Sequence, residues 1–177
     1  LLREAHWQYA FGDDIHRKYT DPLIEEDLRN FLTVQYKDKN LTTSEMDSIV
    51  ANLRNTGGQN DYYALRNAFL LYRDGYDFAY SDGRDNPFRL EYIDFEHPDH
   101  NIFRCVNQFV MEQGRENRRP DILLFINGIP VCIIELKNPT KQNATIHDAH
   151  TQICTRYMRD IPALLKYCAL AVISDGA

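Results

Sequence analysis

The chain has 177 residues, of which 44% are hydrophobic and 26% charged, and its formal net charge at pH 7 is −6. This composition is typical of one globular domain, and no apolar stretch reaches the roughly 18 residues that a membrane-spanning helix needs. The first residues also lack the basic end and long apolar run of a signal peptide, so we expect a cytoplasmic protein with no membrane partner.

The negative net charge argues by itself against a nucleic-acid partner. Its distribution weakens that argument, because residues 101–177 carry nine Lys and Arg against seven Asp and Glu. An enzyme that a partner delivers to DNA also needs no strong basic surface of its own. The cysteines form no CxxC pair, so they indicate neither a zinc site nor a redox motif, and we expect mainly buried thiols at Cys105, Cys132, Cys154 and Cys168.

Three helices are predicted in the first 80 residues. Asp21-Pro22 places a proline at the first position of one helix, whose apolar face continues to residue 32. Thr42 and Glu45 form a capping-box pattern, and apolar residues at 46, 49, 50 and 53 follow with helical spacing. A third helix begins near Asn60 and ends near Gly75. We expect these helices to form an N-terminal lobe over residues 1–80.

The pattern changes to strands in residues 81–177. Strands are predicted over residues 88–95 and 102–111, and apolar runs over 121–126 and 130–136 flank Asn127-Gly128, a strong signal for a two-residue hairpin. Both runs are apolar on both faces, which places them in the middle of a sheet. A capped helix from Thr145 and a buried strand over 170–173 follow. The expected fold is α/β, with a mixed, mainly antiparallel sheet flanked by helices.

Three charged residues interrupt the apolar runs beside that turn. Asp121 opens the first run, while Glu135 and Lys137 stand two apart near the end of the second. Antiparallel pairing brings these ends together, and a two-residue spacing puts Glu135 and Lys137 on one face. Two carboxylates suit magnesium, which takes oxygen ligands and keeps several waters, and the carbonyl of Leu136 could add a ligand. The alternative is an ordinary exposed Glu–Lys pair with Asp121 capping a turn.

A shared metal site depends on the register of the hairpin. Directly opposite residues in an antiparallel pair lie on the same face of the sheet. A regular two-residue turn would pair Asp121 with Ile134 and turn Glu135 to the other face. A three- or five-residue connection, or a bulge, pairs Asp121 with Glu135 instead. We therefore predict an odd loop or a bulge, and a three-residue connection would pair Ile126 with Pro130.

The run RRPDILLFINGIPVCIIELKNP, followed by a helix and then VISDG, resembles the N-terminal nuclease domain of the restriction (motor) subunit of type I restriction endonucleases. The resemblance is strongest over residues 100–177. It implies a nuclease fold of the PD-(D/E)xK kind, in which Asp121, Glu135 and Lys137 are the nuclease residues. It also implies a catalytic role for Gln152 and a DNA contact for Tyr157 on the next helix, although this Tyr follows the Gln by five residues and the commonest motif has four.

Other residues are weaker candidates. Either Glu25 or Glu26 could supply the extra acidic residue of many such nucleases, but two surface glutamates fit the sequence as well. Arg118 and Arg119 could contact DNA phosphates, or be solvated loop charges. The histidine pairs at 97 and 100 and at 147 and 150 are interpreted as solvent-facing rather than as metal ligands.

Together with the charged residues, the resemblance implies a type I site-specific deoxyribonuclease subunit that cleaves double-stranded DNA with magnesium, or with manganese in its place. The resemblance implies ATP-driven motor domains and separate methylation and specificity subunits. The chain contains no GxxxxGK[S/T] phosphate loop, so ATP belongs to the full-length protein alone. Two alternatives are a non-catalytic DNA-binding or assembly module and a repair nuclease or junction resolvase of the same fold.

Overall fold

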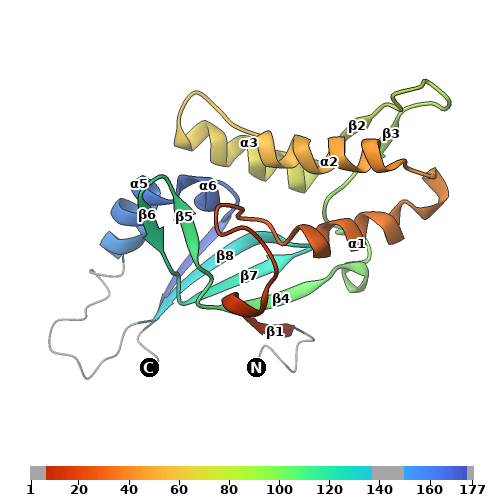
Figure 1. The fold of residues 1–177 in the computed structure, drawn as a ribbon. Helices are drawn as coiled ribbons and strands as arrows, with labels where there is room; N and C mark the ends of the chain where they lie inside the picture. Colours follow the sequence, from red (N-terminus) through yellow and green to blue (C-terminus); the bar gives the residue numbers. More distant parts are fainter. Residues whose placement is uncertain (1–6, 137–149, 175–177) are drawn as a thin grey trace, which may run out of the picture.

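A five-stranded mixed sheet forms the centre of the computed structural model, which describes residues 7–136 and 150–174 (Figure 1). The strand order is β1-β4-β7-β8-β9, in which the three inner strands are antiparallel and both edge strands pair in parallel. This confirms the expected mixed α/β fold. The strands are β1 Gln8–Phe11, β4 Phe103–Asn107, β7 Ile122–Ile126, β8 Ile129–Leu136 and β9 Leu170–Ser174.

The two apolar runs form β7 and β8 in the interior of the sheet, as their composition predicts. Leu123, Phe125 and Ile133 are fully buried on one face, where they pack with the segment that follows residue 150. Two small antiparallel ribbons stand outside the sheet (Figure 1). They are β2 Tyr76–Phe78 with β3 Phe88–Leu90, and β5 Met111–Gln113 with β6 Glu116–Arg118.

The helices before the sheet are α1 Glu25–Gln35, α2 Thr43–Asn55 and α3 Asp61–Asp74, and they pack around one apolar cluster with the turn end of β8. The capping box of Thr42 and Glu45 is present at α2, as predicted. We expected this helix to begin at Pro22, but α1 begins three residues later, at Glu25. Before it, Asp21 Oδ1 accepts the Leu23 N–H in a turn. After residue 150 come a π-helix Gln152–Tyr157, α5 Met158–Asp160 and α6 Pro162–Leu165.

Some expectations differ from the structure. Strand β1 was not predicted, and the strand expected over 88–95 is only β3. The strand expected over 102–111 is divided into β4 and β5, because Gln108 adopts a positive φ of 56° that a strand does not accommodate. The last strand is present, but the expectation that it is buried was wrong, since Leu170 and Val172 are 64% and 41% exposed on the sheet edge.

Among the described residues, no helix is long and apolar enough to cross a membrane.

Candidate nuclease site

A bulge in β8 sets the geometry of the candidate site. Asn127 and Gly128 form the two-residue turn, with φ values of 50° and 75°, and pair Ile126 with Ile129. The register then shifts by one residue at Val131, so that Ile122 pairs with Ile134. The predicted bulge is therefore confirmed, whereas the three-residue connection was wrong. The next residues outward, Asp121 and Glu135, are consequently opposite each other on one face.

Asp121 contacts the end of β8 directly. Its Oδ2 accepts the Leu136 N–H at 2.9 Å, and its own N–H donates to Glu135 Oε1 at 3.4 Å. Gln108 approaches from the other side, donating its Nε2 to Asp121 Oδ1 at 3.3 Å and its N–H to the Asp121 carbonyl at 3.0 Å. These contacts orient the Asp121 carboxylate toward the strand end that carries Glu135.

Glu135 is 2% exposed and is held from the following helix. Tyr157 donates its hydroxyl to Glu135 Oε1 at 2.9 Å, and Gln152 donates its amide to Glu135 Oε2 at 2.8 Å. The Gln152 amide also reaches the Tyr157 hydroxyl at 2.6 Å. The structure therefore brings four predicted site residues together, namely Asp121, Glu135, Gln152 and Tyr157.

The π-helix explains the unusual spacing of Gln152 and Tyr157. An α-helix would place residues five apart about 140° from each other around its axis. The segment Gln152–Tyr157 is a π-helix, in which residues five apart lie one turn apart on the same face. The additional residue of the motif is therefore accommodated by a wider turn, and both side chains still point toward Glu135.

Burial raises the pKa of the Tyr157 hydroxyl well above its ordinary value of 10, and the nearby Glu135 carboxylate raises it further. Both effects penalise a phenolate in this place. Tyr157 therefore stays protonated at neutral pH and serves as a fixed hydrogen-bond donor to Glu135.

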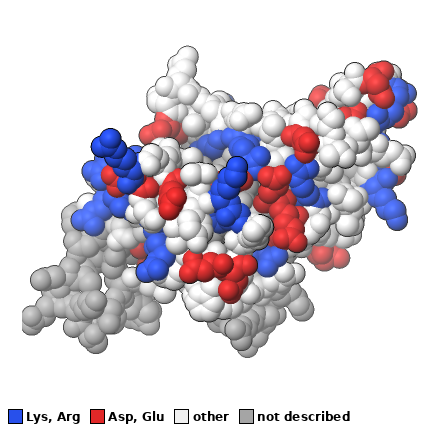
Figure 2. Space-filling model, viewed as in Figure 1, with Lys and Arg blue, Asp and Glu red and all other residues white. Residues whose placement is uncertain are grey.

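The arginines expected near DNA lie beside this group. A cavity of about 370 Å³ is lined by Gln152 and Tyr157 together with Arg118, Arg156 and Arg159. Arg118 is partly neutralised there, because it contacts Asp160 at 2.5 Å and Glu116 at 2.8 Å. Arg119 is exposed in the segment between β6 and Asp121. On the face shown in Figure 2, Lys and Arg are interspersed with Asp and Glu.

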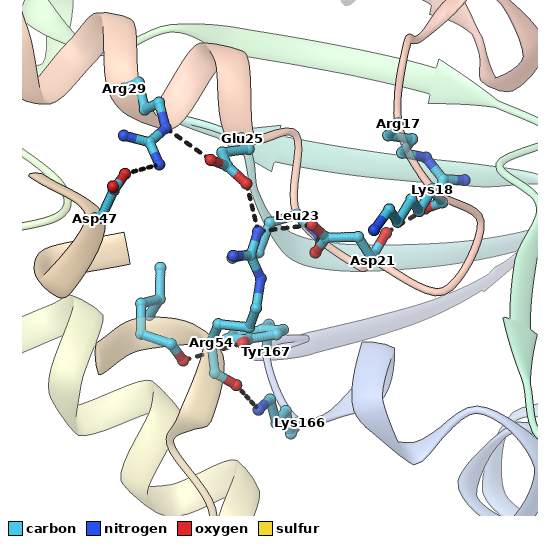
Figure 3. A network of polar contacts seen from close by, with 11 residues as sticks. Arg17, Lys18, Asp21, Leu23, Glu25, Arg29, Asp47, Arg54, Lys166 and Tyr167 are labelled. Atoms are coloured by element: carbon cyan, nitrogen blue, oxygen red, sulfur yellow. Dashed lines mark hydrogen bonds and ion pairs between the residues drawn. The ribbon is translucent and has the colours of Figure 1, made fainter. Parts of the chain in front are cut away.

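Glu25 and Glu26 lie away from Asp121 and Glu135. Helix α1 starts at the turn of the β7–β8 hairpin, where the Ile24 N–H donates to the Gly128 carbonyl. Six residues separate that turn from Asp121, which corresponds to roughly 20 Å. Glu25 contacts Arg29 and Arg54 at 2.6 Å each (Figure 3), and hydrogen bonding from Arg54 lowers its pKa. Glu26 is exposed on the same helix.

The network in Figure 3 borders a larger hollow, of about 840 Å³, between residues 16–29, α2 and α6. Arg54 connects Asp21 and Glu25 there, and Lys166 donates to the carbonyls of Arg54 and Thr56. These contacts join the N-terminal segment, α1, α2 and α6. The hollow is larger than the cavity beside Tyr157, but neither Gln152 nor Tyr157, the residues that contact Glu135, lines it.

One residue that contacts Asp121 was missed by sequence reasoning. Gln108 was not predicted, since its left-handed backbone and its contact with Asp121 arise from the way β4 meets β7.

Lys137 lies outside the described residues, as does the expected cap at Thr145. Leu136 is 47% exposed at the end of β8. Asp13 and Asp14 come to this edge of the sheet, because the preceding Gly12 packs against Gln108.

Asp121 and Glu135 fit the requirements of a hard divalent cation. They offer carboxylate oxygens from adjacent strands, and each carboxylate is oriented by neutral donors, namely the Leu136 N–H for Asp121 and the Gln152 amide for Glu135. Such oxygen-rich pairs suit magnesium, which completes its coordination with water. The arrangement can therefore hold one metal ion at the end of the strands, next to the cavity lined by arginines.

The mixed sheet, with carboxylates at the adjoining ends of two antiparallel strands, is compatible with a nuclease fold. All 177 residues match the family described as the N terminus of the type I restriction enzyme R protein, and the chain belongs to that family. The resemblance identified from the ELKNP region is thus confirmed over the whole chain.

Individual relatives agree with this assignment. The type I restriction enzyme HindI endonuclease subunit of Haemophilus influenzae is 29% identical over 99% of this chain. A Methanocaldococcus jannaschii protein, provisionally named as the type I restriction enzyme MjaIXP endonuclease subunit, is 31% identical over 99% of the chain. A Staphylococcus saprophyticus relative named as the type I restriction enzyme SsaAORF53P endonuclease subunit is 26% identical over 85% of it. The chain spans about a sixth of these proteins, 17%, 17% and 15% respectively.

Proposed function

We propose that this chain contains the DNA-cleaving site of a type I restriction endonuclease and hydrolyses phosphodiester bonds of double-stranded DNA with magnesium. The observation that carries the proposal is the meeting of Asp121 and Glu135, which the bulge at Val131 brings to one face. Such a bulge alters the register and twist of a strand, and bulges of this kind are frequent beside active sites. Family membership favours this function over that of a repair nuclease or junction resolvase.

The two carboxylates and the carbonyl of Leu136 would hold the ion, and manganese could replace magnesium. Bound there, the metal supplies Lewis acidity, which lowers the pKa of a coordinated water and stabilises charge on the phosphate. Lys137 follows Leu136 along the chain, and its ammonium group suits a role in holding the attacking water or neutralising the phosphate. Each of these roles needs the carboxylates fixed in place, which Gln108, Gln152 and Tyr157 achieve.

Tyr157 was expected to contact DNA, but its position favours another role. It is 3% exposed, and its hydroxyl is engaged by both Glu135 and Gln152. We therefore assign it as a positioning residue. Arg118, Arg119 and Arg156 are better placed to contact phosphates, because Arg118 and Arg156 line the adjacent cavity and Arg119 is exposed next to Asp121.

The remaining parts of the reaction belong to the complete enzyme. We propose that motor domains outside this chain bind ATP and move DNA to the site. Methylation and specificity subunits would provide the recognition of the target. The complex would act in the cytoplasm, where the DNA to be restricted is found.

The proposal is tested by substitution in the complete restriction enzyme. Asp121→Asn, Glu135→Gln and Lys137→Ala should each lower the rate of DNA cleavage by roughly a thousandfold or more, because each removes several kcal/mol of metal binding or charge stabilisation. ATP hydrolysis should continue, since the motor is left intact. Asp77→Asn is a matched control, because Asp77 is exposed in the β2–β3 ribbon and its side chain is 76% accessible.

The experiment also separates the proposal from its main alternative. A non-catalytic DNA-binding or assembly module would show the same DNA cleavage with and without these substitutions. Normal cleavage by any one of the three variants would remove that residue from the nuclease site. Normal cleavage by both carboxylate variants would reject the site as a whole.

A further inference from the structure

Three side chains of the connection between β3 and β4 converge on one point, away from the nuclease site. They are Asp94, His97 and His100, and each offers a ligand atom within 4.8 Å of the others. His100 Nδ1 lies 2.9 Å from Asp94 Oδ2, and His97 Nδ1 lies 3.7 Å from the same oxygen. The sequence alone favoured solvent-facing histidines, but the fold directs both rings toward a buried carboxylate.

The carboxylate of Asp94 is fixed by its surroundings. The side chain is 5% exposed, and Oδ1 accepts the N–H groups of Glu96 and His97 at 3.1 and 2.8 Å. Oδ2 therefore faces the two rings, and it also accepts the Gln35 amide from α1 at 3.2 Å. A ligand that the backbone orients in this way loses little conformational freedom when it binds a metal ion.

The two rings are arranged so that both can bind one metal ion. Their centroids are 5.0 Å apart with an interplanar angle of 19°, so the two imidazoles are stacked nearly parallel. Their side chains are 61% and 51% exposed, which leaves a path from solvent to the ligand atoms. For metal–ligand bonds of about 2.0–2.1 Å, ligand atoms of a tetrahedral site stand about 3.3 Å apart. The two measured distances from Asp94 Oδ2 lie on either side of that value.

The short spacing in the chain supports the same arrangement. Pro98, Asp99 and His100 form a 3-10 turn that begins after His97, so that residues three apart return to the same side. Asn101 closes the loop, because its side chain accepts the Asp94 N–H at 2.9 Å and donates to the Asp94 carbonyl at 2.7 Å. The positions of His97 and His100 relative to Asp94 are therefore set by local backbone structure.

We propose that Asp94, His97 and His100 form a second metal site, which binds a divalent transition metal such as zinc through two imidazoles and one carboxylate. Imidazole ligands select zinc, nickel or copper over magnesium, which separates this site chemically from the nuclease pair. Water would occupy the fourth position. The bound ion would tie the loop to α1 through Gln35 and to the hairpin turn through Asn101, which contacts Asn127 at 2.7 Å. The ion would therefore stabilise the junction between the loop, α1 and the hairpin turn.

The experiment measures zinc binding by the chelator-treated chain with calorimetry, and the thermal midpoint with and without zinc. One zinc ion per chain should bind saturably and raise the thermal midpoint, and both effects should persist in a large excess of magnesium, which occupies the nuclease pair but competes poorly for imidazole ligands. In the His97→Asn, His100→Asn double variant, zinc affinity should fall at least tenfold and the rise should disappear. Asp94 is left in place, because its removal would also break the turn.

A second variant guards against zinc at another position. His150 Nε2 lies 3.5 Å from the exposed thiol of Cys154 and provides the matched control. The His150→Asn, Cys154→Ser variant should bind zinc as the unaltered chain does. Loss of zinc binding in this variant alone would overturn the proposal. An absence of saturable binding would also overturn it. The cluster would then be explained by the hydrogen bond between His100 and Asp94 alone.

Discussion

Glu135 depends on two neighbouring donors, and this gives a test at the scale of single residues. Tyr157→Phe removes the hydroxyl that contacts Glu135 at 2.9 Å but retains the buried ring. A hydrogen bond to a charged group contributes about 1.5–3 kcal/mol, so cleavage by the complete enzyme should fall roughly tenfold to a hundredfold. Gln152→Ala should also reduce cleavage without unfolding the helix, because alanine is the better helix former.

The control for Tyr157→Phe is Tyr72→Phe. The Tyr72 hydroxyl is also buried and donates to the Tyr167 carbonyl at 3.1 Å, but it contacts no residue of the nuclease group among the described residues. This variant should lower the thermal midpoint and leave the cleavage rate unchanged. Equal loss of cleavage in both variants would show that Tyr157 acts through general stability and not through Glu135.

At this scale the sequence predicted residue types better than their contacts. Asp121 and Glu135 were identified because unpaired charge is costly inside apolar strands. Gln108 was not, since nothing in its local sequence indicates a positive φ or a hydrogen bond to Asp121. Glu25 illustrates the converse, because a glutamate on a helix pairs with arginines as readily as with a metal ion, and only the fold shows which.

The π-helix makes a prediction at the scale of one element. Deletion of Thr155, which is exposed, would give Gln152 and the tyrosine the spacing of four that an α-helix brings to one face. The segment should become α-helical, both side chains should still reach Glu135, and cleavage should stay within a few-fold of normal. Circular dichroism and DNA cleavage by the complete enzyme measure the two effects.

Deletion of Ser48 is the corresponding control in an ordinary α-helix. Ser48 is exposed in the middle of α2, and its loss would rotate the following buried residues by about 100° relative to the preceding turns. This deletion should unfold α2 or lower the thermal midpoint strongly. If deletion of Thr155 lowers the thermal midpoint as much as deletion of Ser48 does, the interpretation that the π-helix accommodates one additional residue is wrong.

The cap of α2 provides a pH-dependent test. The pKa of Glu45 is lowered from 4.5 to about 2 by the backbone N–H of Thr42 and by Arg84. A carboxyl group with a depressed pKa stabilises the fold fully above pH 4.5, and this contribution is lost as the pH falls toward about 2. Glu45→Gln should therefore lower the thermal midpoint at pH 7, and the difference should shrink steadily between pH 4.5 and 2.

Exposed Glu112 offers the control for this measurement, as Glu112→Gln. Its substitution should change the thermal midpoint only slightly, and by nearly the same amount at each pH. If Glu45→Gln lowers the thermal midpoint equally at pH 7 and pH 3, the stabilising role assigned to the charge of Glu45 is wrong. The capping box itself was predictable, because Thr42 and Glu45 interact within four residues; the partner Arg84 was not, because it comes from the distant β2–β3 connection.

For the whole molecule, the order of helices and strands followed from local patterns, but the edges of the sheet did not. The inner strands β7 and β8 are apolar on both faces and are joined by a turn that Asn-Gly specifies. Strand β1 is short, and it pairs in parallel with β4, almost a hundred residues later in the chain. Pairing over such a distance leaves no local signal, and the exposure of β9 likewise depends on what lies next to it.

The last prediction concerns DNA cleavage by this chain alone. The net charge is −6, and acidic and basic side chains are mixed on the face in Figure 2, so little holds DNA in place. If Arg118, Arg119 and Arg156 supply the phosphate contacts, three released counterions give a slope of about −3 in a plot of log affinity against log salt. Binding should therefore be weak, and cleavage in magnesium at least a hundredfold slower than by the complete enzyme. Triple substitution of these arginines by glutamine should flatten the slope. Tight binding with a steep slope, together with rapid cleavage at any sequence, would show that the nuclease needs no motor to deliver it to DNA.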